Sequence, residues 1–214
     1  MPSQSLRLSC ALAVTLLAMS APAASATLEF VFKKPSDAKG WSAATQDWVV
    51  KKSGYTPIIQ SKVDPVQPVA LYKGKFGDVT VRTDLNVNPK NTFGGGPLIR
   101  GKVKGVRVSG YVAQASFLVG DFMIFSLYRF DKLAVDFTGD GDAELLCQKE
   151  IFKFPKDAET TVTISAEGDL IELRYGKKLI CSKRDSTYTE GRVGLINQFS
   201  ESYPRYRRVT IKTP

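Results

Sequence analysis

The feature that most constrains this chain is a two-residue alternation of apolar and polar side chains, repeated in short segments between turn residues. It is clearest over residues 79–87, where Val79, Val81, Leu85 and Val87 share one face and Thr80, Arg82, Asp84 and Asn86 share the other. Successive side chains of a β-strand point to opposite faces, so this segment is predicted to be a strand buried on one side only. The sequence suggests only one helix, a short one over residues 42–47.

Ten further strands are predicted, bounded by glycine-, aspartate- and asparagine-rich turns. They cover residues 97–103, 106–118, 121–129, 133–137, 143–151, 160–165, 170–175, 178–182, 191–197 and 207–212. So many short strands predict an all-β fold of two packed antiparallel sheets, because a single sheet would leave an apolar face in water. We find no linker or internal repeat, and expect residues 27–214 to form one domain.

Residues 1–26 have the three parts of a secretory signal peptide. Arg7 gives a positive start, Leu8–Met19 is apolar, and Ala24-Ser25-Ala26 is a small-residue cleavage site. The alternative is an uncleaved anchor, but the apolar run is shorter than the ~20 residues that span a bilayer. We therefore expect an exported protein, periplasmic or extracellular, with no transmembrane segment after cleavage.

Two cysteines, Cys147 and Cys181, remain after that cleavage. They have no C-x-x-C spacing, which argues against redox catalysis and zinc binding. In an oxidising compartment they are expected to form one disulfide, the alternative being two buried free thiols.

The chain contains no histidine. This excludes Ser-His-Asp and Cys-His hydrolases and every metal site that needs an imidazole ligand. Lys and Arg number 30 against 21 Asp and Glu, which gives a formal net charge of +9. A basic protein of this kind attracts anionic polymers of the cell envelope.

Several segments of the second half occur together in one known superfamily. They include the hairpin of residues 168–180 and the run Gly191-Arg192-Val193-Gly194-Leu195 before a closing strand. With these segments, residues 72–211 resemble the concanavalin A-like lectin/glucanase superfamily, and most closely its laminin-G-like and bacterial 3-keto-disaccharide hydrolase domains. The resemblance implies a jelly-roll sandwich that binds ligands on its concave sheet. It assigns the candidate ligand contacts to Arg82, Asp84, Asn86, Arg100, Gln114, Tyr128 and Arg129.

The resemblance leaves binding and catalysis both open, because this superfamily contains lectins, hydrolases and adhesion modules. No E-x-D-x-x-E row like that of its glucanases is present, although Asp84 and Asp136 are available to a hydrolase with scattered carboxylates. We expect first a module that binds a saccharide or an anionic envelope polymer. The alternatives are a secreted glycan-processing hydrolase and a structural or adhesion module that binds a protein.

Three further features have simpler explanations. The acidic run of residues 140–144 has the oxygen ligands that calcium needs, but it reads better as a hairpin turn, and no other cofactor or metal is expected. Residues 203–208 interleave aromatic and basic side chains as some nucleic-acid surfaces do, but a sheet edge is the better interpretation, so no nucleic-acid partner is expected. Trp41 and Trp48 are expected to pack in the core rather than to stack on sugars.

Overall fold

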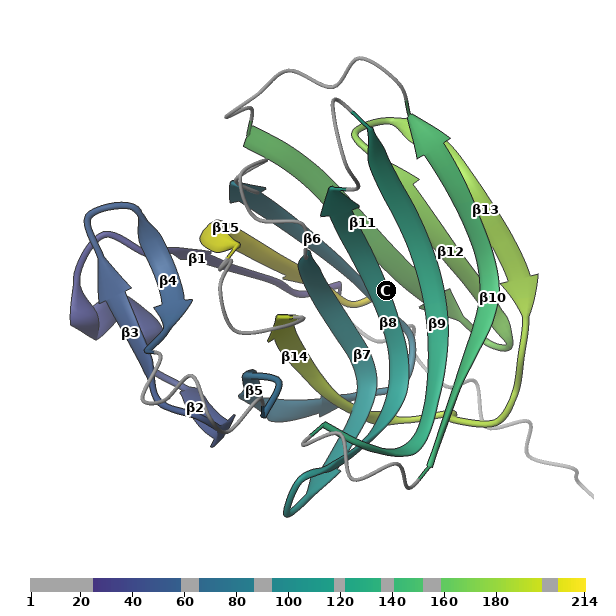
Figure 1. Ribbon diagram of the computed structural model, residues 1–214, viewed down its shortest axis with the longest axis horizontal. Coiled ribbons are helices and arrows are strands. Elements are labelled where there is room, and N and C mark those ends of the chain that lie inside the picture. Colours follow the sequence, from purple (N-terminus) through teal and green to yellow (C-terminus); the bar gives the residue numbers. More distant parts are fainter. Residues whose placement is uncertain are drawn as a thin grey trace, which may run out of the picture.

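The computed structural model describes residues 25–58, 66–86, 94–117, 122–135, 141–151, 159–197 and 204–214, which form two antiparallel sheets packed face to face (Figure 1). The seven-stranded sheet contains, in spatial order, β10 (Asp142–Ile151), β9 (Met123–Ala134), β8 (Arg107–Phe117), β7 (Gly95–Lys104), β14 (Gly191–Asn197), β5 (Val69–Phe76) and β2 (Trp41–Thr45). The eight-stranded sheet contains β13 (Lys178–Arg184), β12 (Leu170–Tyr175), β11 (Glu159–Glu167), β6 (Val79–Asn86), β15 (Arg205–Lys212), β4 (Gly54–Pro57) and β3 (Trp48–Lys51), with β1 (Thr27–Val31) also paired to β15. The predicted all-β sandwich is confirmed.

The described part of the chain contains one helical element, the short 3₁₀ helix η1 (Pro35–Ala38). Within those residues, no helix has the length and apolarity that crossing a bilayer requires. The expected signal peptide, apart from Ser25 and Ala26, lies outside the described residues.

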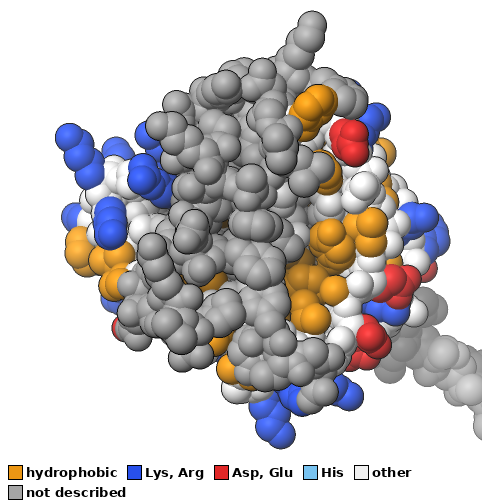
Figure 2. Space-filling view, in the orientation of Figure 1, with side chains coloured by type: hydrophobic (Ala, Val, Ile, Leu, Met, Phe, Trp, Pro, Cys, Tyr) orange, Lys and Arg blue, Asp and Glu red, His pale blue; other side chains and the backbone are white. Residues whose placement is uncertain are grey.

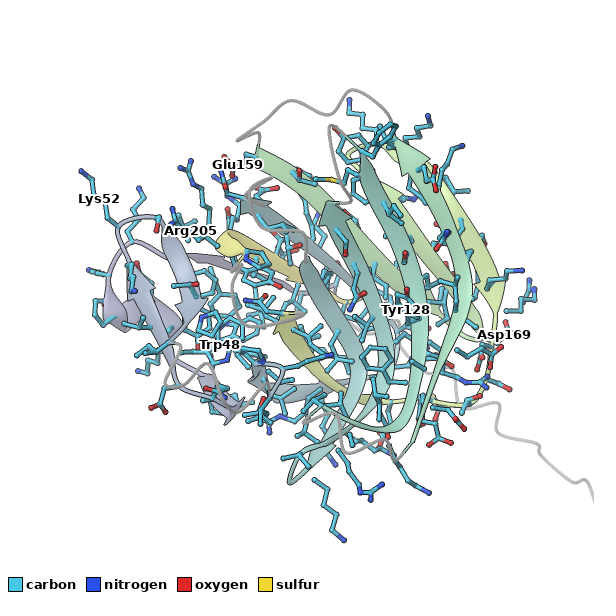
Figure 3. The ribbon with its side chains drawn as sticks, in the orientation of Figure 1. Trp48, Lys52, Tyr128, Glu159, Asp169 and Arg205 are labelled. Atoms are coloured by element: carbon cyan, nitrogen blue, oxygen red, sulfur yellow. A yellow bond between two sulfur atoms is a disulfide. The ribbon has the colours of Figure 1, made fainter. Side chains whose placement is uncertain are left out.

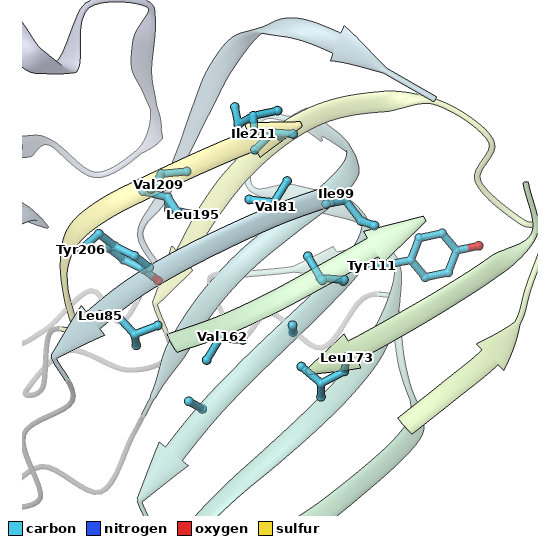
Figure 4. Packing of buried hydrophobic residues seen from close by; sticks show 14 of the residues in the cluster. Val81, Leu85, Ile99, Tyr111, Val162, Leu173, Leu195, Tyr206, Val209 and Ile211 are labelled. Carbon is cyan, nitrogen blue, oxygen red and sulfur yellow. The ribbon is translucent and has the colours of Figure 1, made fainter. Parts of the chain in front are cut away.

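The main core lies between the two sheets, where the alternating pattern places one face of each strand (Figure 4). On the eight-stranded sheet, Val81 of β6 lies opposite Ile164 of β11 on one side and Ile211 of β15 on the other. From the seven-stranded sheet, Tyr111 and Leu195 belong to the same cluster. Full burial of such aliphatic side chains stabilises a fold by about 1.5–3 kcal/mol each.

The seven-stranded sheet is apolar on its other face too. Val112, which lies between the core residues Tyr111 and Ala113, belongs to a second buried cluster with Leu98, Phe130 and others. The outer face of the eight-stranded sheet is instead polar, with Thr80, Arg82 and Asp84 alternating with core residues. The two outer faces therefore differ in chemistry.

The prediction of a helix over residues 42–47 was wrong. Residues Trp41–Thr45 form β2, which pairs with β5 in the register Trp41↔Tyr72 and Ser42↔Leu71. Trp41 is buried in the aromatic core, and the buried Thr45 hydroxyl donates to Gln67 O (2.6 Å) and accepts from Val69 N (2.8 Å). These tertiary contacts decide the conformation of a segment whose local pattern is weak.

The separate strands predicted at residues 121–129 and 133–137 are one strand, β9, to the extent that the structure describes them. Lys132 has a positive φ of 52°, and its amide donates to Ser109 Oγ (3.0 Å), so the strand continues past a local irregularity. Gly141 has a φ of 92°, and a Cβ at this position would collide with the Lys132 carbonyl. The hairpin between β9 and β10 therefore requires glycine here.

Residues 203–208 were predicted to form a sheet edge. This prediction was wrong for the described residues 205–208. They belong to β15, which lies between β6 and β4 inside the eight-stranded sheet. Tyr206 is fully buried, and its hydroxyl lies within hydrogen-bond distance of Ile196 O (2.8 Å) and Asn197 Oδ1 (2.9 Å). This aromatic residue therefore packs in the core.

A disulfide between Cys147 and Cys181 joins β10 to β13, the two strands at one lateral edge of the sandwich. The Cα atoms of these residues are 6.4 Å apart, within the range of native disulfides. The disulfide expected from the cysteine pair is thus present, and it links one sheet to the other.

Candidate functional site

The seven predicted ligand contacts lie in four places. Arg82, Asp84 and Asn86 lie on the outer face of β6, whereas Gln114 of β8 and Tyr128 of β9 lie on the outer face of the opposite sheet. Arg100 is in the interior, and Arg129 is near the ends of the sheets beside residues 185–187. Of the seven, the structure brings together Gln114 and Tyr128 on the seven-stranded sheet, and Arg82, Asp84 and Asn86 on the eight-stranded sheet.

Tyr128 lies on the outer face of the seven-stranded sheet, where hydrophobic side chains reach the surface over β8 and β9 (Figures 2 and 3). Its ring is half-buried, and its centroid is 6.0 Å from that of Phe130. Its cross-strand neighbours are Val112 and Leu145, and Leu145 is 44% exposed. An accessible aromatic ring in an apolar surround is suited to packing against the face of a sugar ring.

Polar groups lie one step along the same face. Gln114 and Ser126 are cross-strand partners, and both are largely buried. Gln114 Nε2 has no hydrogen-bond partner among the described residues. A buried donor without a partner costs about 1–3 kcal/mol. Gln114 is itself only 1% exposed, so this amide would gain a hydrogen bond only from a ligand that displaces the groups covering it. The sequence analysis named Gln114 and Tyr128 as candidates but not Ser126 and Leu145, which the strand register places beside them.

Arg82, Asp84 and Asn86 form a polar row on β6. Asp84 is 8% exposed, and its Oδ1 accepts hydrogen bonds from Thr161 Oγ1 (2.7 Å) and from Arg82 Nε and Nη2 (3.3 and 3.2 Å). Asn86 is half-buried next to Glu159 and Arg205 in the strand register. The row is therefore partly engaged within the sheet, with Arg82 remaining exposed.

Arg100 is 1% exposed, and hydrogen bonds within the protein already occupy its guanidinium group, so it is not available to a ligand. Its guanidinium donates to the carbonyl oxygens of Gly77 (3.0 Å), Tyr188 (2.9 Å) and Gly168 (2.8 Å) and to Asp78 Oδ1 (3.2 Å). The side chain thus ties three loops to β7, so we leave Arg100 out of the candidate site.

Arg129 takes part in a charged network that sequence reasoning did not foresee. Its Nη1 donates to Asp185 Oδ2 (2.5 Å), and its Nη2 pairs with Glu144. Tyr111 Oη donates to Asp185 Oδ1 (2.7 Å). Burial alone would raise the pKa of Asp185, but hydrogen bonds from Thr187, Tyr111 and Arg129 outweigh burial and lower the pKa to about 2. Burial is also the main reason that the pKa of Tyr111 rises to about 12.

This network predicts a pH dependence of stability. An Asp whose folded-state pKa lies below its unfolded value contributes stability above the unfolded value and loses it as the pH falls. For Asp185 the contribution is intact above about pH 4 and disappears towards pH 2, with a size of about 2 kcal/mol. Chemical denaturation at pH 6 and pH 2.5 should therefore show a smaller loss of unfolding free energy in Asp185→Asn than in the wild type.

The control is Asp169→Asn, which removes an exposed carboxylate paired with Arg184. An equal change of the acid response in both variants would contradict a specific role of Asp185.

The remaining candidates from the sequence are engaged in ion pairs, pack in the interior or lie outside the described ranges. Asp136 and Asp140 are outside them, and Glu144 of the acidic run pairs with Arg129. Across the described residues, no group of three or more Cys, Asp or Glu side chains is arranged to hold a metal ion. Trp41 is 8% exposed, and Trp48 packs 5.0 Å from the Tyr55 ring.

Comparison with solved structures shows that this two-sheet arrangement is the jelly-roll β-sandwich fold of several lectin-like domains and glucanases. One similar structure is the carbohydrate-binding module CBM66 from Bacillus subtilis, with a TM-score of 0.63 and 18% identity, covering 81% of this chain and 96% of that one. A legume lectin-like domain from Entamoeba histolytica has a TM-score of 0.59 and 15% identity, covering 86% of this chain and 95% of its own. The Bacillus licheniformis β-glucanase has a TM-score of 0.58 and 10% identity, covering 88% and 98%. At these identities the likeness concerns the fold. No family model and no curated protein matches the sequence.

Proposed function

We propose that this protein is an exported carbohydrate-binding module whose saccharide ligand lies on the outer face of the seven-stranded sheet. The observation that carries the proposal is the placement of the Tyr128 ring one step from Gln114, whose amide donor has no partner among the described residues. Saccharides need this pairing, because a ring face packs on an aromatic group while amide groups bind the hydroxyls. Several proteins of the same fold are named for carbohydrate binding, which supports the proposal.

Binding is favoured over hydrolysis by the state of three described carboxylates that lie among the predicted ligand contacts or pair with one of them. Asp84 is held by Arg82 and Thr161, while Asp185 and Glu144 are held by Arg129. A glycoside hydrolase needs two carboxyl groups facing each other across the substrate, one of them protonated. We therefore expect the protein to bind glycans without forming reducing-sugar products.

Export is part of the proposal. It rests on the signal-like segment of residues 1–26 and on the Cys147–Cys181 disulfide, a bond typical of oxidising compartments.

Tyr128→Ala should weaken the binding of a neutral glycan by about fivefold or more, because loss of an aromatic platform costs about 1–3 kcal/mol per stacked ring in the analogous case of nucleic-acid bases. The experiment measures depletion of the protein from solution by insoluble cellulose, β-1,3-glucan, xylan and chitin. Tyr128→Phe, which keeps the ring, should retain binding.

Leu179→Ala is the matched control, because it removes an exposed apolar side chain from the opposite sheet. Wild-type protein that no glycan depletes, or a Tyr128→Ala variant that binds as the wild type does, would overturn the proposal. If reducing sugars are released, and if this activity copurifies with the protein, the hydrolase alternative is favoured instead.

A further inference from the structure

The outer face of the eight-stranded sheet contains a cleft of about 410 Å³ that lies on the sheet opposite Tyr128. Strands β1, β6, β11 and β15 form it, and its lining consists of threonine hydroxyls, three cations and one carboxylate. The cations are Arg82, Arg208 and Lys212, and the carboxylate is Glu29. Among the described residues, no apolar side chain lines this cleft, in contrast to the face that carries Tyr128.

The strand register explains how these groups come together. Thr210 of β15 and Thr163 of β11 lie directly opposite Arg82 of β6, and Lys212 lies opposite Thr80 in the next row. Each row therefore sets hydroxyls beside a cation across three hydrogen-bonded strands. A second cleft of about 350 Å³ shares Thr80 and Lys212 and extends towards β12, but its lining includes four apolar residues and the carboxylates of Glu167 and Glu172. The positively charged part of this surface is therefore the first cleft.

A buried carboxylate holds two of the cations in place. Arg82 donates to Asp84 Oδ1, and Arg208 Nε lies 3.8 Å from Asp84 Oδ2. The side chains of Arg82 and Arg208 stay 54% and 49% exposed, so both guanidinium groups are fixed at one edge and accessible elsewhere. Arg208 also lies 3.5 Å from Glu29. Lys212 is exposed and makes no ion pair with another described residue. The three cations exceed the two neighbouring carboxylates, and the cleft keeps an excess of positive charge.

We propose that this cleft is a second glycan site, specific for an acidic saccharide whose carboxylates pair with Arg82, Arg208 and Lys212. Guanidinium groups bind carboxylates through paired, charge-assisted hydrogen bonds, and the threonine hydroxyls match the neutral hydroxyls of a sugar ring. The inference goes beyond the site proposed at Tyr128. It gives the domain two binding faces of different specificity, so one molecule can connect a neutral glycan to an acidic one.

Titration calorimetry of the full-length protein with trigalacturonate tests the proposal, and the fully methyl-esterified trisaccharide is the uncharged counterpart. Trigalacturonate should bind and the ester should bind at least about tenfold more weakly. Lys212→Gln and Arg82→Gln should each weaken trigalacturonate by about fivefold or more, because each removes one charge-assisted contact. Lys104→Gln, which removes an exposed cation from the opposite sheet, should change the affinity by less than about twofold.

Four results would overturn the second site. They are no binding of trigalacturonate, equal binding of the ester, equal weakening by Lys104→Gln and Lys212→Gln, and loss of trigalacturonate binding in Tyr128→Ala. The last would place the acidic ligand on the other face. Failure of the second site can be distinguished from failure of the proposed function, because the proposed function is tested only by the binding of neutral glycans and by the Tyr128 variants.

Discussion

Replacing Arg100 with methionine should lower the free energy of unfolding by about 3–5 kcal/mol, the cost of removing one partner of a buried charged network. The guanidinium is 1% exposed and satisfies three backbone carbonyls, of Gly77, Gly168 and Tyr188. Methionine has a similar length but no donor, so all three carbonyls lose a charge-assisted hydrogen bond. Urea denaturation followed by tryptophan fluorescence measures the difference.

Arg174→Met is the control for loss of an arginine from the same fold. Arg174 is 39% exposed and pairs with Glu172 at 2.9 Å on the surface of β12, so its loss should cost about 1 kcal/mol or less. If Arg100→Met does not fold, Asp78→Asn, which weakens only the partly exposed partner, gives a graded test. A loss below about 1 kcal/mol in Arg100→Met would contradict the role of Arg100 as an interior tie.

Removing the disulfide should have the next largest effect. Cys147 and Cys181 are separated by 34 residues, and closing a loop of this length stabilises a fold by roughly 3–4 kcal/mol in the chain-entropy model. For a domain of this size, such a loss lowers the melting temperature by about 10 °C. The Cys147→Ser/Cys181→Ser double variant and the reduced wild-type protein should therefore melt at similar, lowered temperatures.

The position of the bond gives a sharper version of this test. The disulfide joins two edge strands, β10 and β13, so hydrogen exchange should rise first in those strands when it is absent. Protein shown by thiol titration to be fully reduced, yet with an unchanged melting temperature, would contradict the prediction.

The alternating pattern was sufficient for the fold class but not for every element. It identified β6 and β11, in which each buried apolar residue is flanked by polar ones. It failed at β2, because Ala43 and Ala44 carry little pattern and the pairing with β5 decides the conformation. Strands β1, β3, β4 and β5 were not predicted at all. Strands β1, β3 and β4 are only four or five residues long, and β1, β4 and β5 pair with β15 or β14, which lie far away in the chain.

The sequence predicted which types of residue lie on the outer faces of the sheets better than it predicted which of them lie close together. Gln114 and Tyr128 share a face because β8 and β9 form a hairpin, a local relation that sequence supports. Arg82 lies on the other sheet because β6 pairs with β11 and β15, which are far away in the chain. Arg100 was expected in the ligand groove from the family resemblance. Its burial could not be predicted, because it depends on loops at residues 77, 168 and 188 that no local sequence pattern brings together.

The central place of β15 has a consequence for how this protein acquires its structure. The last strand pairs with β1, β4 and β6, so the residues nearest the two ends of the described chain meet only after everything between them is available. Such distant pairing makes assembly slow, because the whole intervening polypeptide must be ordered first. During synthesis, the eight-stranded sheet therefore stays incomplete until β15 has been made, and β1, β4 and β6 lack one of their partners until then.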